Sequence, residues 1–230
     1  SLMYLSQWRI RADSSRILRV MGDCYVLHQK IMEIFPKGLS DRKADLSLLY
    51  RVERRAPEEG HIIFIQSKIE PDRDFVSTGS FAKGGEVNEF QTKKYSTFIS
   101  SLSTDRLYGF LIHANPCVKK GTSTREARLS GEKNNGKRIA IKKYNDLAFW
   151  LELKSFDHGF SLQELSIGEK VVKTGYKRKD GEKHRITCEG CAFSGILQIT
   201  DKALFLRAVE NGIGPGKAFG YGLLSLAPVG

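Results

Sequence analysis

The stretch "NGIGPGKAFGYGLLSLAP", residues 211–228, places five glycines around one lysine, Lys217. The residues before the glycines, 201–212, predict a helix, and residues 220–228 predict a strand. A dinucleotide-binding G-x-G-x-x-G has the opposite order, since it follows a strand and opens a helix, and a P-loop needs Ser or Thr after its lysine. The stretch therefore excludes these two nucleotide-binding α/β motifs.

A purely structural interpretation of the glycines makes Gly212 the residue that ends the helix and lets the others form a tight turn. The other glycines are Gly214, Gly216, Gly220 and Gly222. Such a turn accounts for one or two glycines but not for five. The stretch therefore predicts a place where bare backbone lies close to something else.

The first half of the chain predicts the order of a ferredoxin-like domain. A strand at residues 4–10 precedes one amphipathic helix, from about Cys24 to Phe35, which Asp23 caps and Pro36 stops. Two strands follow at 46–54 and 61–69, then a loop or short helix, and then a further strand within 89–99. The order β-α-β-β-(loop or helix)-β is that of a ferredoxin-like fold.

The second half repeats this pattern. A strand at 106–116 leads to a helix at 144–156, with its apolar side formed by Leu147, Trp150, Leu151 and Phe156. Strands at 160–176 and 184–200 flank a turn, and the helix and strand around the glycines complete the set. We therefore expect an α+β protein with two tandem ferredoxin-like (βαββαβ) domains, residues 3–100 and 105–230, and a C-terminal glycine-rich loop.

The charge balance points to a polyanionic partner. The 230 residues are 40% hydrophobic and 27% charged, as in globular proteins, but the formal net charge is +11 and the pI is about 9.5. Residues 119–143 hold nine basic residues against two acidic ones, and residues 170–185 hold seven against two. Nucleic acid is the favoured partner, while an anionic membrane surface and simple solvation of a charged face remain alternatives.

From the sequence we expect no membrane span, no signal peptide and no zinc site. No apolar run approaches the ~18–20 residues of a membrane span, and no signal-peptide pattern opens the chain, so we expect a cytoplasmic protein without membrane contact. The four cysteines are Cys24, Cys117, Cys188 and Cys191. The last two form C-x-x-C, which could be half of a zinc site, but no second half exists and ordinary strand cysteines are expected.

Several motifs together resemble one known family. Two Gly-x-Gly triplets separated by five residues resemble the glycine-rich loop of CRISPR repeat-associated proteins. They are Gly212-Ile213-Gly214 and Gly220-Tyr221-Gly222. The phrase "GIGPGKAFGYGLLSLAP" looks like the ending of the CasE-type endoribonucleases of the Cascade complex. Similar segments run along the chain in the same order: "MYLSQWRI", "YVLHQKIMEIFP", "HANP", "NGKRIAI…FWL" and "YKRKDGEK".

The resemblance implies two ferredoxin-like domains and a defined activity. Members of this family bind the stem-loop of a CRISPR repeat transcript and cut once at the 3′ base of the stem, with no metal or other cofactor. They then typically stay bound to the mature guide and become a subunit of the surveillance complex. The implied partners are the repeat RNA stem-loop and other Cascade subunits, with no DNA contact expected for the isolated protein.

His28 matches the catalytic histidine of that family. Metal-independent cleavage uses the substrate's 2′-OH as nucleophile and leaves a 2′,3′-cyclic phosphate and a 5′-OH, so protons must move at the 2′ and 5′ oxygens. Histidine suits this step because its unperturbed pKa is about 6.5. Tyr25 lies three residues earlier, on the same side of the helix, and either orients the phosphate or the 2′-OH or simply packs. Which proton His28 moves stays open.

The resemblance also assigns RNA contacts. Lys177, Arg178 and Lys179 match the hairpin that contacts the RNA groove, and Lys137 and Arg138 would lie along the same face. The glycine-rich loop could approach the first domain and the RNA near the scissile phosphate, with Lys217 available to a phosphate oxygen. Purely structural packing between the domains is the alternative.

The other histidines are weaker candidates. His61, His158 and His184 are interpreted as surface or contact residues, and His113 stands where the family has arginine. Two rival functions remain: a module that binds an RNA hairpin without cutting it, which would not need His28, and a metal-dependent nuclease or zinc-ribbon protein that uses Cys188 and Cys191.

Overall fold

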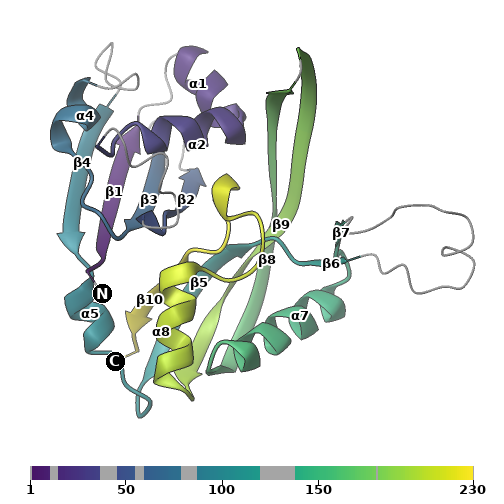
Figure 1. Ribbon diagram of the computed structural model, residues 1–230. Coiled ribbons are helices and arrows are strands. Elements are labelled where there is room, and N and C mark those ends of the chain that lie inside the picture. Colours follow the sequence, from purple (N-terminus) through teal and green to yellow (C-terminus); the bar gives the residue numbers. More distant parts are fainter. Residues whose placement is uncertain are drawn as a thin grey trace, which may run out of the picture.

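The computed structural model describes residues 2–10, 15–36, 46–54, 60–78, 87–119, 138–179 and 181–229. Within these residues the chain forms two four-stranded antiparallel sheets and a two-stranded ribbon (Figure 1). None of the helices described there is both long enough and apolar enough to span a membrane.

The first sheet has the strand order β2-β3-β1-β4. The elements of this half, in chain order, are β1 (Tyr4–Ile10), α1 (Ser15–Gly22), α2 (Cys24–Met32), β2 (Leu49–Arg54), β3 (His61–Ser67), α4 (Arg73–Thr78), β4 (Val87–Lys94) and α5 (Ser96–Ser100). A central first strand between the third and the fourth is the ferredoxin-like arrangement. The predicted fold of this half is confirmed.

Between β1 and β2 the described residues include two helices, α1 and α2, where the sequence predicted one. α1 begins at Ser15, in a segment for which the sequence predicted no helix, and its Ile17 is fully buried in the core of the first sheet. Asp23 then caps α2 as predicted, and its Oδ1 accepts from the N–H groups of Tyr25 at 3.0 Å and Val26 at 3.1 Å. α2 ends at Met32, before the predicted Phe35, although Phe35 is still buried.

The predicted strand within residues 89–99 is wrong in its second part. β4 ends at Lys94, and α5 begins two residues later. The Tyr95 N–H donates to the carbonyl of Met3 at 2.7 Å, and its ring stacks on Phe98 with the centroids 5.3 Å apart. These contacts end the strand pairing and turn the chain into the helix.

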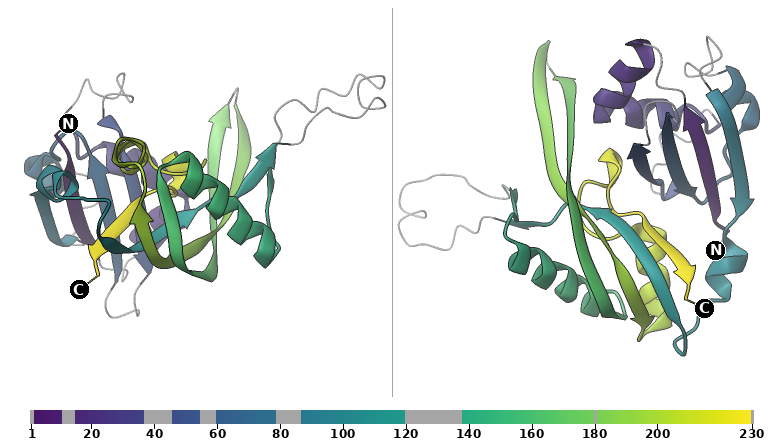
Figure 2. Two further views of the ribbon diagram at one scale, coloured as in Figure 1. Left: turned by 90° about the horizontal axis from the view of Figure 1, so that it is seen from below. Right: turned by 180° about the vertical axis from the view of Figure 1, so that it is seen from behind.

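The second sheet has the order β10-β5-β9-β8, which is again ferredoxin-like. Its half contains β5 (Leu107–Ala114), β6 (Cys117–Lys119), β7 (Arg138–Ala140), α7 (Tyr144–Asp157), β8 (Phe160–Lys179), β9 (Glu182–Ile199), α8 (Lys202–Asn211), the 3₁₀ helix η2 (Lys217–Phe219) and β10 (Leu224–Pro228). The β6–β7 ribbon is inserted between β5 and α7. Helices α7 and α8 cover one face of this sheet, and its other face is seen from behind (Figures 1 and 2).

The β8–β9 hairpin is longer than predicted. Pairing continues to Lys179 opposite Glu182, so most of the expected turn at 177–183 is strand. The hairpin extends past the rest of its sheet and rises beside α1 and α2 of the first half (Figure 1). This extension brings a basic segment of the second domain to the helix that carries His28.

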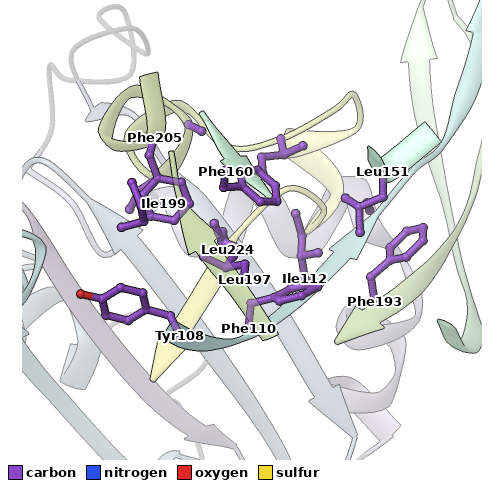
Figure 3. Packing of buried hydrophobic residues seen from close by; sticks show 14 of the residues in the cluster. Tyr108, Phe110, Ile112, Leu151, Phe160, Phe193, Leu197, Ile199, Phe205 and Leu224 are labelled. Carbon is purple, nitrogen blue, oxygen red and sulfur yellow. The ribbon is translucent and has the colours of Figure 1, made fainter. Parts of the chain in front are cut away.

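Each sheet packs its own hydrophobic core. Figure 3 shows the second core, where Phe110 and Phe193 from the sheet lie among the residues that meet Leu151 of α7 and Phe205 of α8. Phe156, predicted to face this core, is 85% exposed, because it lies about 140° around the helix from Leu151.

Parts of the first half contribute to the second core. Met3, Tyr95 and Leu102 are buried in it, next to the residues of the second sheet. The domain bounds 3–100 and 105–230 remain a prediction. The two halves nevertheless share apolar packing across that division.

Candidate active site and nucleic-acid interface

His28 lies on α2, half-buried, over an aromatic ring from the neighbouring sheet. Its ring stacks on Tyr50 of β2, with centroids 6.2 Å apart and an interplanar angle of 21°. Tyr50 is 1% exposed, and burial raises the pKa of its hydroxyl, which therefore stays a protonated donor. That hydroxyl donates to the carbonyl of Ala218 in η2 at 3.0 Å. One tyrosine thus joins the candidate catalytic histidine to the glycine-rich loop.

The loop itself is pressed against the first domain. A methyl group added at Gly220 would lie 2.9 Å from Cε2 of Tyr50, and one added at Gly212 would lie 2.8 Å from a methyl carbon of Leu49. Contacts this short cannot hold a side chain without displacement of the neighbour. The predicted close approach of bare backbone to the first domain is therefore present in the structure.

Positive φ angles give the loop its shape. Gly212 ends α8 with φ +73°, as predicted, while Gly216 and Gly220 flank η2 in the left-handed region. The sequence predicted no such short helix. The Gly222 N–H donates to the carbonyl of His113 at 2.8 Å, and the Tyr221 hydroxyl donates to the carbonyl of Val171 at 2.6 Å. These bonds fix the loop to β5 and to the base of the hairpin.

The hairpin touches α2 at its first turn. Asp23 Oδ1, which caps α2, lies 3.4 Å from the backbone N of Tyr176 on β8. A methyl group added at Gly175 would lie 2.9 Å from Sγ of Cys24 and equally close to the backbone N of Tyr25. Tyr25 is half-buried at this junction. The site is therefore walled by α2, the hairpin and the glycine-rich loop.

Basic side chains lie at the far end of the hairpin. Lys177 and Arg178 are exposed there, and the ammonium group of Lys183 lies 4.1 Å from the ring centroid of Tyr176. The side chain of Lys179 and the whole of Lys137 lie outside the described residues. The exposed positions fit the predicted contact with an RNA stem.

Arg138 and Lys217 meet elsewhere, in an open hollow beside the glycine-rich loop. Burial lowers the pKa of Lys217 from its ordinary value. Arg138 lies on β7, which flanks the lower part of the hairpin and not its tip (Figure 1). The structure thus places Lys177 and Arg178 at the tip of the hairpin, and Arg138 and Lys217 in the hollow beside the glycine-rich loop.

Sequence reasoning missed Tyr50, and it gave Lys173 and His113 no part in the site. Tyr50 carried no signal, because its ring contacts a different element of its own domain and its hydroxyl a residue of the other domain. Lys173 was only one member of a charge run, yet burial first and Arg54 second lower its pKa to about 8. His113 is buried enough that its pKa falls to about 4, with Arg51 and Lys173 adding to the effect. Strand alternation could have indicated Lys173, since Gly175, two residues on, faces α2.

The remaining candidates have ordinary surroundings. All four cysteines are free thiols, and no cluster of three His, Cys, Asp or Glu side chains suited to a metal occurs among the described residues. His61 and His158 are half-buried, and burial lowers the pKa of both, whereas His184 is exposed.

Comparison with known proteins identifies relatives over the whole length. The family model described as "CRISPR associated protein" matches residues 3–228. The chain is 26% identical over 234 residues to the CRISPR-associated endoribonuclease Cse3 of Thermus thermophilus, covering 98% of this chain and 100% of the relative. It is 31% identical over 228 residues to the Cascade subunit CasE of Escherichia coli K12, covering 99% and 100%.

Solved structures agree with this relationship. A structure of the CRISPR endoribonuclease Cse3 bound to a 19-nucleotide RNA is similar with a TM-score of 0.79 at 25% identity, covering 99% of this chain and 100% of that one. The crystal structure of Cas6e from Escherichia coli K-12 gives a TM-score of 0.63 at 26% identity, covering 98% and 100%. The chain therefore belongs to the family of CRISPR-associated proteins.

Proposed function

We propose that this protein is an endoribonuclease that binds the stem-loop of a CRISPR repeat transcript and cuts it once, at the 3′ base of the stem. The carrying observation is the position of His28, which lies between the basic hairpin and the glycine-rich loop and stacks on the tyrosine that holds this loop. The full-length relationship to proteins named endoribonuclease Cse3 and Cascade subunit CasE supports this proposal.

In the proposed mechanism the stem lies along the hairpin, with Lys177 and Arg178 against its phosphates. Its base then reaches α2, where His28 transfers a proton at the 2′-oxygen or at the leaving 5′-oxygen. The 2′-oxygen attacks the adjacent phosphorus as the bond to the 5′-oxygen breaks, which leaves a 2′,3′-cyclic phosphate and a 5′-OH. No step of this mechanism uses a metal ion, and Tyr25 orients the reacting groups.

The proposal extends to the fate of the product. After the cut the protein keeps the hairpin of the guide RNA and joins a Cascade complex, as the name of its Escherichia coli relative indicates for that protein. Because the substrate is a transcript, the proposed location is the cytoplasm.

The test is cleavage of the cognate repeat hairpin in excess EDTA. The wild type is compared with His28→Ala, and the natural RNA with one that carries 2′-deoxyribose at the scissile nucleotide. We expect one cut by the wild type, a loss of about 10²–10⁴-fold in rate for His28→Ala, and no cut of the deoxy RNA. Hairpin binding should persist in both cases.

Two other outcomes would select the rival functions. Tight binding by the wild type without any cleavage would make the protein a hairpin-binding subunit and leave His28 as a packing residue. Cleavage that stops in EDTA and returns with a divalent metal would support a metal-dependent nuclease.

A further inference from the structure

An open hollow of about 550 Å³ lies between α7 and the glycine-rich loop. One wall is formed by Trp150, Lys154 and His158, which recur every four residues along α7. The other wall is the loop backbone from Gly212 to Lys217. This volume is in the range of pockets that hold small organic ligands and is too small for an RNA duplex. We call this hollow the α7 groove.

Among the described residues, the lining of the α7 groove carries positive charge only. Its titratable side chains are Arg138, Lys154, His158, Lys217 and the thiol of Cys117, with no carboxylate among them. Asp157 lies outside the lining and pairs with Lys154 at 2.8 Å, but this pair is largely exposed and holds Lys154 only weakly. Burial and the charges of Lys154 and Lys217 lower the pKa of His158. The groove therefore suits a ligand with several negative charges.

The loop wall is backbone that a ligand can approach closely. A methyl group at Gly214 would lie 3.0 Å from the Trp150 ring, so the loop lies flat against α7. Trp150 is itself fixed by stacking on Phe193, with centroids 6.1 Å apart. Among the described backbone hydrogen bonds, none uses the N–H groups of Gly214 or Gly216. These N–H groups can donate to phosphate or sugar oxygens.

The groove begins beside the candidate catalytic centre. Lys217 lines the groove, and the carbonyl of the next residue, Ala218, accepts the hydroxyl of Tyr50, on which His28 stacks. In Figure 1 the hairpin rises beside α2, while the glycine-rich loop lies below α2, next to the lower part of the hairpin. A strand that leaves the base of a stem held on the hairpin would therefore meet the groove next.

We propose that the α7 groove binds single-stranded RNA that flanks the base of the repeat stem, with Arg138, Lys154 and His158 contacting its phosphates. This inference rests on the proposed function, because the hairpin must first be bound beside it. It adds a second contact region, so that the enzyme recognises the junction between duplex and single strand and not the stem alone.

The test measures binding of three RNAs that carry 2′-deoxyribose at the scissile nucleotide. One is the hairpin alone, one has a short single-stranded extension on the 5′ side, and one has it on the 3′ side. The variant is Lys154→Ala with His158→Ala, and the matched control is Lys93→Ala with Lys94→Ala, two exposed lysines on β4. We expect one extension to tighten wild-type binding by about tenfold, through two or more phosphate contacts.

The Lys154→Ala/His158→Ala variant should lose this gain while it binds the bare hairpin as the wild type does, and the control should keep the gain. The extension that tightens binding identifies the strand in the groove. Equal affinity for all three RNAs in the wild type, or a gain that survives in the groove variant, would overturn the inference while leaving the proposed function intact. Failure of the wild type to bind any hairpin would overturn both.

Discussion

Tyr50 is the residue through which the two domains meet at the proposed active site. Its ring supports His28, and its hydroxyl holds Ala218 of the glycine-rich loop. His28 and Tyr50 lie on different elements, and Ala218 is more than one hundred positions from Tyr50. Neither contact therefore leaves a local pattern in the sequence. The tyrosine therefore positions the site without touching the RNA.

Removal of the Tyr50 hydroxyl should loosen the loop while the ring under His28 remains. We expect Tyr50→Phe to lower the single-turnover cleavage rate roughly tenfold, since small displacements of positioned groups are costly, and to lower stability by about 1 kcal/mol. Tyr108→Phe is the matched control, because it removes a hydroxyl that accepts the Ser103 N–H far from the site at 3.0 Å. An equal loss of rate in both variants would contradict this role.

His113 should make the folded protein sensitive to acid. Its pKa is about 4 in the folded protein, below the ordinary value of 6.5, chiefly because burial disfavours the charged ring. Between these two pH values the unfolded chain binds a proton that the folded chain does not, so stability falls as the pH drops from about 6.5 to 4.

The measurement is the free energy of unfolding at several pH values for His113→Gln and His184→Gln. His113→Gln should reduce the slope of the free energy of unfolding against pH in this range. The reduction should be equivalent to at most about one bound proton. His184→Gln is the control, because it removes an exposed histidine outside the site, and the change in slope should be larger for His113→Gln. Parallel curves for the wild type and His113→Gln would show that the ring is charged in the folded protein.

At the scale of elements, the glycine-rich loop combines backbone shape with close contact, and two glycines separate these effects. Gly220 and Gly181 both have φ +82°, but a methyl group at Gly220 would meet the Tyr50 ring, whereas nothing lies within 4 Å at Gly181. We expect Gly181→Ala to cost about 1–2 kcal/mol of stability from backbone strain. Gly220→Ala should cost about 1–3 kcal/mol more through overpacking, as thermal or chemical unfolding will measure.

The β8–β9 hairpin should account for much of the salt dependence of binding. Lys177→Ala with Arg178→Ala removes two exposed charges at its tip. The slope of log Kd against log salt concentration should fall by about one for each phosphate that the variant no longer neutralises. Arg106→Ala with Lys202→Ala removes the same charge elsewhere and should leave that slope unchanged, although the net charge falls equally. Equal slopes in the two variants would mean that overall charge, and not the hairpin, controls binding.

The sequence predicted best those elements that depend on neighbouring residues. The cap at Asp23, the end of α8 at Gly212 and the order of strands follow from local chemistry and periodicity. The sequence misled where a tertiary contact decides, as in α1, whose Ile17 is buried by the sheet, and in α7, where Phe156 faces solvent.

The candidate site was predictable only in part for the same reason. His28 has no distinguishing pattern on its helix and was found through the family resemblance. Tyr50 and Lys173 became candidates only when the two domains were seen together, and His113, a weaker candidate in the sequence, gained its lowered pKa only there. Lys137 and the side chain of Lys179 lie outside the described residues, so their proposed contacts rest on the resemblance alone.

At the scale of the whole molecule, buried polar contacts cross between the domains. Gln66 Nε2 donates to the carbonyl of Val209 at 2.7 Å, and Arg51 donates to Oγ of Ser225 at 2.7 Å. Lys68 forms an ion pair with Glu210. Together with the shared apolar packing around Met3 and Tyr95, these contacts predict that the two domains unfold as one unit.

The two tryptophans allow a direct test, because Trp8 lies in the first core and Trp150 in the second. In Trp150→Phe the fluorescence reports the first domain, and in Trp8→Phe the second. In each variant the fluorescence midpoint in urea should coincide with the midpoint from far-UV circular dichroism. Gln66→Ala should lower the free energy of unfolding by about 1–3 kcal/mol, because it leaves a buried carbonyl unpaired. Both fluorescence midpoints should shift together. Separate midpoints would show independent domains.

The place of the glycine-rich loop in chain order has a consequence during translation. Domains fold as units, with N-terminal ones first as the chain leaves the ribosome. His28 and Tyr50 therefore emerge well before residues 212–222, which supply Lys217 and the carbonyl that Tyr50 holds. Until that loop has emerged, the nascent protein has its histidine but not the wall that closes the site, so a partly synthesised chain cannot cut transcripts near its own ribosome.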